Sequence, residues 1–463
     1  MKRRQPMPPR RLSTADVRRS LALSIVEGAC YAVMVGLGEA YFIADAVRLG
    51  ATSLQIGLLV GLPLAVGGLA ATVVVHGLRK LRRRRPLAAG MGALQGAVLL
   101  VLSYLESTDR TTAGLLLLIF CIHHACGQVC GALWSSWYGD LVPAGIRGRY
   151  FARRARVVHL LTFGAVVGGG FLLQTFEAQG HPVLADGSGG SGFALLFLLA
   201  GVARLASAIL LLCSLEPRMR AAPKRGIFQI LRIPEQRDAV RLTLVGCAVS
   251  FVVYAGSPFF GPHMLVNLHL DYRSFMLASA AQVAAKVLSL RAFGHAVDHS
   301  GPFPVFRLAL LAVALVPLPW LFIDGLGGVL MVQVFSGISW AAHEIGTLGL
   351  LLSQSRPRYR SRIFAAQSLL NGFGQLTGTM SGVALIALFS GSYVAAFAAS
   401  LAGRLLIVLM LPVWLGDLSR GRPIGHRELI LRVVGLRPSG GVVHRPISQA
   451  PPAAEAEQKV QGN

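Results

Sequence analysis

Charged side chains are scarce in this sequence of 463 residues. Asp, Glu, Lys and Arg together make up 14% of it, whereas hydrophobic residues make up 54%. A soluble chain of this length could form two or three domains, but it would need far more charge to cover its surface. The mean hydropathy of +0.60 points the same way. The scarcity of charge therefore argues against a soluble globular protein.

Acidic residues are rarer than basic ones, with 20 Asp and Glu against 44 Lys and Arg. Such an excess can indicate a nucleic-acid binder, but its distribution argues against that function. If the N-terminus is cytoplasmic, 38 of the 44 fall in the two terminal tails and the even-numbered interhelical loops. This is the positive-inside rule, so we expect two cytoplasmic termini and no nucleic-acid partner. The basic clusters also attract anionic membrane lipids.

Cysteines and chemical motifs are also few. None of the six cysteines lies in an expected external loop, which argues against a disulfide framework. We find no nucleophile elbow, zincin motif or phosphate-binding loop. We therefore expect no enzyme activity, no cofactor and no ATP-driven pump. The first apolar stretch is too long for a signal-peptide core, which predicts a retained helix.

Apolar residues occur in blocks long enough to cross a hydrocarbon core of roughly 30 Å. Because the bilayer core offers no water to backbone groups, these blocks must be helices, and the expected fold class is all-α. The sequence predicts twelve transmembrane helices, near 22–47, 54–77, 87–105, 113–139, 156–176, 192–214, 242–261, 274–293, 304–323, 327–353, 364–389 and 393–416.

A charged, proline-bearing stretch divides these helices six and six. The segment RGRYFARR at 147–154 matches RSRIFAAQ at 360–367, and Arg204 and Arg404 occupy corresponding places in the two halves. Parallel six-helix repeats are a transporter architecture. We expect a basic N-tail (1–20), an N-terminal bundle (21–216), a linker (217–240), a C-terminal bundle (241–416) and a tail (417–463) that is amphipathic over 425–438 and then disordered.

The chain resembles the major facilitator superfamily over about residues 20–416. The family's loop signature is present as GHAVDHSGP with Gly294, Asp298 and Gly301, whereas its first copy, GLRKLRRRRP, has Leu81 in place of Asp. The segments at 139–154 and 257–272 resemble a bacterial branch of the family. The resemblance implies two pseudo-symmetric six-helix bundles and a cytoplasmic gate, to which we assign Gly294, Asp298, Arg147, Arg149, Arg360 and Arg362. For the four arginines, a role only in setting the membrane topology is the alternative.

The first expected helix carries two acids, Glu27 and Glu39. A charge in the membrane needs a partner or a watery cavity, and such acids often mark proton or ion routes. On one continuous helix the two would lie about 120° apart. Glu39 is therefore the candidate proton carrier, and a fixed ion pair with a neighbouring helix is the alternative.

Polar side chains follow one stripe on each of three C-terminal helices. A lipid-facing helix has no use for such a stripe, so it should line either a helix contact or a water-filled path. We favour the path. The candidate residues are Gln282, Lys286, Trp340, His343, Glu344, Asn371 and Gln375. Lys286 and Glu344 could form a switching ion pair, or Lys286 could hold an anionic solute group.

Two other groups of residues invite a structural reading. Arg204 and Arg404 are interpreted as buried structural residues with acidic partners, because they are duplicated. His123, Cys126 and Cys130 share a helix face and could bind copper or zinc. Their spacing matches no known zinc motif, so close helix packing is favoured and no metal site is assigned.

The sequence thus favours a secondary transporter that moves a small organic solute by alternating access, coupled to protons. We expect a monomer in the bacterial inner membrane. A membrane sensor or scaffold of the same fold is the alternative, favoured by Leu81, and a transition-metal transporter is another.

Overall fold

The computed structural model describes residues 13–77, 83–178, 190–217, 233 and 236–415, and these form helices without a strand. The expected amphipathic tail helix (425–438) and most of the expected linker lie outside the described residues. The N-terminal half comprises α1 (Thr14–Leu37), η1 (Glu39–Tyr41), α2 (Phe42–Arg48), α3 (Ser53–Gly77), α4 (Arg85–Ser107), α5 (Ala113–Leu141), η2 (Ala144–Ile146), α6 (Arg147–Ala178) and α7 (Gly190–Leu212).

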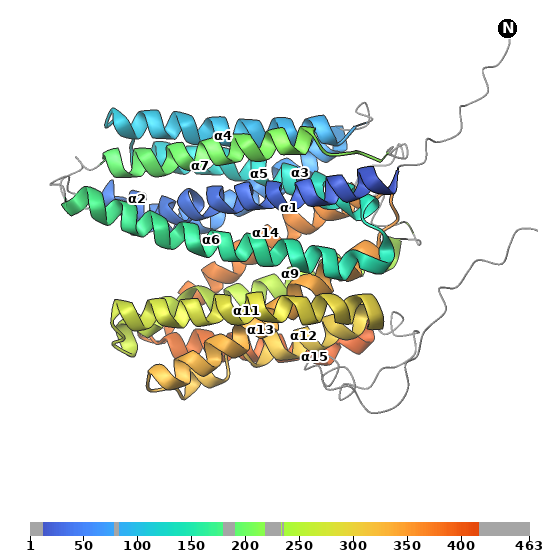
Figure 1. The fold of residues 1–463 in the computed structure, drawn as a ribbon. Coiled ribbons are helices and arrows are strands. Elements are labelled where there is room, and N and C mark those ends of the chain that lie inside the picture. The colour runs from blue at the N-terminus through green and yellow to red at the C-terminus, as the bar shows by residue number, and fades with distance from the viewer. Residues whose placement is uncertain (1–12, 78–82, 179–189, 218–232, 234–235, 416–463) are drawn as a thin grey trace, which may run out of the picture.

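The C-terminal half follows with a similar order of elements. It comprises α9 (Arg237–Tyr254), η4 (Ser257–Phe259), α10 (Phe260–Pro262), η5 (His263–Asn267), α11 (Tyr272–Ser300), α12 (Pro302–Leu315), η6 (Pro319–Leu321), α13 (Leu326–Gln354), α14 (Arg360–Leu388) and α15 (Tyr393–Leu415). In Figure 1 the two halves lie one above the other, with helix axes running across the picture. We call the face at which α1 begins, on the right, the basic face.

Eleven of the described helical segments are long and apolar enough to cross a membrane. The twelfth expected span is α14, which has 29 residues and packs against α3 and α9. It falls outside the eleven because its polar residues, among them Gln367, Asn371 and Gln375, lower its hydropathy. Counting α14, the structure is consistent with the twelve spans that the sequence predicts.

The first and seventh spans are broken near the face opposite the basic one. The sequence predicts a continuous helix over 22–47, but α1 ends at Leu37 and Gly38 leads into η1 and α2. The seventh span ends α9 at Tyr254 and continues through 3₁₀ and π turns that contain Pro258 and Pro262. Proline removes a backbone donor, and glycine lacks the helix preference of other residues, which accounts for both breaks.

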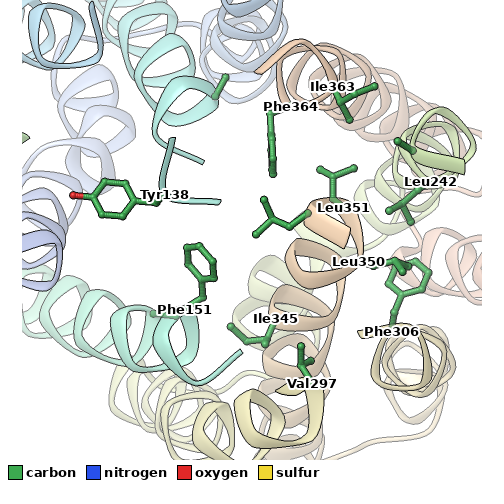
Figure 2. Packing of buried hydrophobic residues seen from close by; sticks show 14 of the residues in the cluster. Tyr138, Phe151, Leu242, Val297, Phe306, Ile345, Leu350, Leu351, Ile363 and Phe364 are labelled. Atoms are coloured by element: carbon green, nitrogen blue, oxygen red, sulfur yellow. The ribbon is translucent and has the colours of Figure 1, made fainter. Parts of the chain in front are cut away.

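The largest hydrophobic cluster joins the two halves at the basic face. The cluster includes Tyr138 and Phe151 from the N-terminal half and Val297, Leu351 and Phe364 from the C-terminal half (Figure 2). At the opposite face the halves have separate clusters, one around Phe42 and Phe197 and another around Trp320 and Phe397. The halves are therefore sealed together at the basic face and are packed independently at the other.

Glycines permit the close approach of helices from different halves. A Cβ added at Gly294 on α11 would lie 2.6 Å from that of Ala152 on α6, and one added at Gly148 would lie 2.3 Å from the Gly294 carbonyl oxygen. The α3–α14 crossing has the same character, because a Cβ on Gly372 would lie 2.6 Å from the Leu64 carbonyl oxygen. The seal thus depends on backbone contacts that larger residues would obstruct.

Candidate transport site

A cavity of about 600 Å³ lies within the C-terminal half. It extends along α9 from Leu242 to Tyr254 and onward past the break to Met264. Its walls also come from α11, α12, η6, α13 and α14. This volume is in the range of small-molecule binding sites.

The cavity wall is polar and aromatic but carries no Asp, Glu, Lys or Arg among the described residues. Of the residues singled out in the sequence, five lie in it: Gln282, Trp340, His343, Asn371 and Gln375. Gln333, Gln367 and Trp320 belong to the same wall. The wall therefore offers amides, hydroxyls and ring faces to a ligand and no full charge.

Several polar atoms on this wall have no hydrogen-bond partner. They are Gln367 Oε1, Asn371 Oδ1, Thr347 Oγ1 and Trp320 Nε1. By contrast, Gln282 Nε2 donates to Ser336 Oγ at 3.0 Å. These four atoms have almost no accessible surface, so it is the other atoms of their side chains that contribute to the cavity wall.

A glycine makes room for two of these amides. A Cβ added at Gly246 on α9 would lie 3.0 Å from Gln367 Nε2 and 3.2 Å from Asn371 Oδ1. The position therefore tolerates no larger side chain without displacing both amides. It marks the deep end of the cavity, toward the basic face.

An ion cluster joins the two halves one helical turn from the cavity wall. Lys286 Nζ lies 2.9 Å from Glu344 Oε2, and His159 Nε2 on α6 lies 2.9 Å from the same oxygen. Lys286 follows Gln282 by four residues on α11, and Glu344 follows Trp340 by four on α13. A change at the cavity wall can thus reach a contact between the halves.

The N-terminal half contains a buried polar network. Glu39 Oε1 and Gln95 Nε2 each lie 3.0 Å from His123 Nε2. Arg204 Nε donates to Gln95 Oε1 at 2.7 Å. Since Arg204 can only donate, it fixes the amide with its NH₂ toward His123. Nε2 has one lone pair or one hydrogen, so Glu39 and Gln95 compete for it.

Glu27 ends this network nearer the basic face. It accepts hydrogen bonds from Arg154 at 2.8 Å and Ser207 at 2.9 Å, and Arg204 lies 3.9 Å away. Its side chain is 4% exposed, so its charge is balanced within the bundle. The angle expected between Glu27 and Glu39 does not apply, because α1 ends between them. The two acids are instead connected through Gln95 and Arg204.

Arg404 differs from the expected buried ion pair. Its guanidinium donates to the carbonyl oxygens of Val313 and Val253 and to the hydroxyls of Ser400 and Ser257, with no carboxylate among these partners. Val253 and Val313 lie in the last turns of α9 and α12, where carbonyls carry partial negative charge and accept long N–H bonds, from Gly256 at 3.2 Å and from Val316 at 3.4 Å. The ends of two helices thus take the place of the expected acid.

Asp298, of the loop signature, links the halves at the basic face. It accepts from the backbone N–H of Gly148 at 2.6 Å, the N–H of Arg149 at 3.0 Å and the side chain of Arg149 at 3.0 Å. The carboxylate is 3% exposed and lies at the N-terminus of α6, where helix dipoles favour a negative charge. Gly294, one turn earlier, permits the close contact with Gly148.

The corresponding link of the other half uses a different acid. Leu81 lies outside the described residues, and Asp140 on α5 forms ion pairs with Arg360 and, at 2.6 Å, with Arg84. Ser361 donates to Ser136 beside them at 2.7 Å.

Two of the expected gate residues have other surroundings. Arg147 donates to the carbonyls of Gly139 and Val142 within its own half, and Arg362 is buried.

The residues considered for metal binding do not converge. No group of three or more His, Cys, Asp or Glu side chains suited to a metal occurs in the described part of the chain. Nε2 of the buried His123 lies within hydrogen-bond distance of Glu39 and Gln95. Cys126 and Cys130 are buried free thiols.

Sequence reasoning missed His159, Gln95 and Asp140. None of the three belongs to a polar stripe with the repeated spacing that marked α11, α13 and α14. A signal was present for Asp140, which ends α5 beside the duplicated RGRYFARR segment. For His159 and Gln95 only the cost of a polar group in the membrane could have indicated a role.

The family model described as the Major Facilitator Superfamily matches residues 21–379, and the chain belongs to that family. It is a multi-pass membrane transporter of that superfamily. No curated protein matches the sequence.

Solved structures agree at the level of the fold. The human organic anion transporter MFSD10 (TETRAN) has a TM-score of 0.64 at 13% identity, over 88% of this chain and 100% of that one. The proton:xylose symporter XylE bound to 6-bromo-6-deoxy-D-glucose has 0.65 at 12%, over 86% and 96%. A bacterial homologue of the iron transporter ferroportin, in an outward-facing state, has 0.60 at 13%, over 86% and 98%.

Proposed function

We propose that this protein is a secondary transporter that carries a small organic solute through the C-terminal cavity by alternating access, coupled to proton movement. The observation that carries the proposal is a cavity with polar walls in a bundle whose halves share a hydrophobic cluster at the basic face and have separate clusters at the opposite face. A solute in that cavity needs the seal to open before it can leave at the basic face.

The basic face is the cytoplasmic one in this proposal. Arg84, Arg85, Arg147 and Arg360 lie at helix ends on that face, as the positive-inside rule requires of a cytoplasmic surface. The protein would then sit in a bacterial inner membrane with both termini in the cytoplasm. The described conformation would be closed to the cytoplasm, with Asp298 and Asp140 as the links that must break.

Two sites are candidates for the coupling proton. At the Glu39–His123 pair, an ionised Glu39 accepts a hydrogen bond from Nε2–H of His123. When both groups are neutral, Nε2 can instead accept a hydrogen bond from the amide of Gln95. At the second site, a protonated His159 strengthens the contact with Glu344 across the halves. Opening at the basic face removes His159 from Glu344, so proton affinity would differ between the two states.

The test is proton movement in liposomes that contain the purified protein, with a pH dye inside and organic solutes outside. We expect a solute-dependent pH change that Glu344→Gln abolishes and Glu39→Gln abolishes or uncouples from solute uptake. Asp109→Asn, at an exposed turn with a left-handed backbone (φ 49°) that Asn tolerates, is the matched control. Solute uptake that proceeds without any pH change would refute proton coupling and leave transport intact.

A further inference from the structure

The cavity has two chemically different ends. Its deep end, toward the basic face, carries Gln367, Asn371, Thr347 and His343 around Gly246. Its other end, beyond the break in the seventh span, carries aromatic and thioether side chains: Tyr254, Phe260, Met264, Phe275 and Trp320. On α9 alone, Leu242 and Tyr254 are about 18 Å apart at 1.5 Å per residue. The cavity is therefore long, with a polar end and an apolar end.

The deep end is polar and uncharged. Gln367 and Asn371 lie on one face of α14, one turn apart, and together with Thr347 they supply amide and hydroxyl groups to the wall. Such groups both donate and accept hydrogen bonds, so they suit the hydroxyl or amide groups of a ligand. An anionic head would lose its water shell without a cation in the described wall to pair with.

A cationic head is disfavoured for a different reason. The wall has no carboxylate, and the neighbouring Glu344 already faces Lys286 and His159. The nearest charge without an acidic partner is that of Arg404, which donates to Ser257 of the wall at 3.1 Å. A positive solute would gain no ion pair and would meet a like charge.

We infer that the solute is an uncharged amphipathic molecule, with a head rich in hydroxyl or amide groups at Gln367 and Asn371 and an aromatic or alkyl portion between Phe260, Phe275 and Trp320. This assignment rests on the proposed transport function and names its substrate class. The aromatic end stabilises the apolar portion by burial and ring contacts, and the deep end selects an uncharged head that exchanges hydrogen bonds with its amides and hydroxyls.

The test is calorimetric binding to the full chain in lipid nanodiscs that contain no glycoside detergent, since such detergents share the proposed chemistry. The probes are phenyl β-D-glucoside, methyl β-D-glucoside, phenyl β-D-glucuronide and 2-phenylethylammonium. We expect phenyl β-D-glucoside to bind at least about tenfold more tightly than each of the other three, which lack the aromatic portion or carry a charge.

Two variants test which end of the cavity binds each portion of the solute. Asn371→Leu should weaken the phenyl glucoside about tenfold, and Trp320→Leu should narrow the ratio between the phenyl and methyl glucosides. Gly164→Ala is the control, since a Cβ there meets nothing within 4 Å.

Equal or tighter binding of the glucuronide or the ammonium compound would overturn the assignment, and so would no binding of any probe. Either result would leave alternating access to be judged separately, by distances between the halves.

Discussion

Arg204 and Arg404 occupy corresponding places in the two halves, but their surroundings differ. Arg204 lies in a network with Gln95, Ser207 and Glu27, and its charge is balanced by that acid. Arg404 donates to two helix ends and two hydroxyls, and none of these partners in the described part of the chain is an acid. The arginine at the corresponding position thus belongs to an internal ion network in one half and supports a broken helix in the other.

The same contrast extends to the polar residues around each arginine. In the N-terminal half Glu27, Glu39 and His123 hydrogen-bond to protein groups. In the C-terminal half Gln367 and Asn371 lie on the wall of a cavity, and their side-chain oxygens accept no hydrogen bond from a described protein group. We infer that the N-terminal half is the more rigid of the two and that the solute binds to the other.

The largest expected effect comes from breaking the N-terminal network. Glu27→Gln leaves Arg154 and Arg204 buried without their acid, and a buried charge that loses its partner costs about 3–5 kcal/mol. The expected result is a large fall in thermal stability in nanodiscs. Glu39→Gln, at a more exposed position, should lower the thermal stability much less. Equal losses of stability in the two variants would contradict a structural role for Glu27.

Asp298→Asn should have the next largest effect, on the seal rather than on stability. It removes a charge that accepts three hydrogen bonds across the halves, and bonds to charged groups contribute about 1.5–3 kcal/mol each. A cysteine at Ser136, buried behind the seal, should react about tenfold faster with an impermeant thiol reagent. Asp109→Asn should leave the rate unchanged, and an equal rise there would contradict the account.

Arg404→Met should cost less than Glu27→Gln, about 1–2 kcal/mol, because it removes hydrogen bonds to uncharged groups and leaves no buried charge behind. The measurement is again thermal stability in nanodiscs, with Arg204→Met as the partner variant. Arg204→Met should cost more, since it removes one of the two cations that balance Glu27. The reverse order would contradict the comparison between the halves.

Gly246→Ala should have the smallest effect on folding and a selective one on transport. The added methyl displaces the amides of Gln367 and Asn371, so we expect about a tenfold loss of kcat/KM for solute uptake with little change in stability. Gly164→Ala should leave both the uptake rate and the stability unchanged. Equal uptake by the two variants would place the solute elsewhere.

Helix number, order and approximate ends were predictable, because a bilayer-length apolar run leaves few alternatives. The polar stripes of α11, α13 and α14 predicted five residues of the cavity wall, because a polar side chain in the membrane needs a helix contact or a water-filled path. The breaks near Gly38 and Tyr254 were not predicted, since apolar composition continues through both. Neither were the partners of Arg404, because carbonyls at helix ends have no sequence signature.

The cross-half contacts were beyond prediction as well. His159 and Glu344 are far apart in sequence and meet only through the packing of α6 against α11 and α13. Asp298 and Arg149, both assigned to the gate from the sequence, form an ion pair between the halves, and their role in gating stays a prediction. The ion pair of Asp140 with Arg360 was not predicted, because the family signature would have placed an acid at position 81.

The most direct test of alternating access is a pair of distances measured by double electron–electron resonance in nanodiscs, in a background without native cysteines. One pair of labels, at Gly145 and Pro357, spans the halves at the basic face, and another, at Ser107 and Leu388, spans them at the opposite face. With Asp298→Asn, we predict that the first distance lengthens while the second shortens. Distances that both stay fixed, or that lengthen together, would contradict alternating access of the two halves.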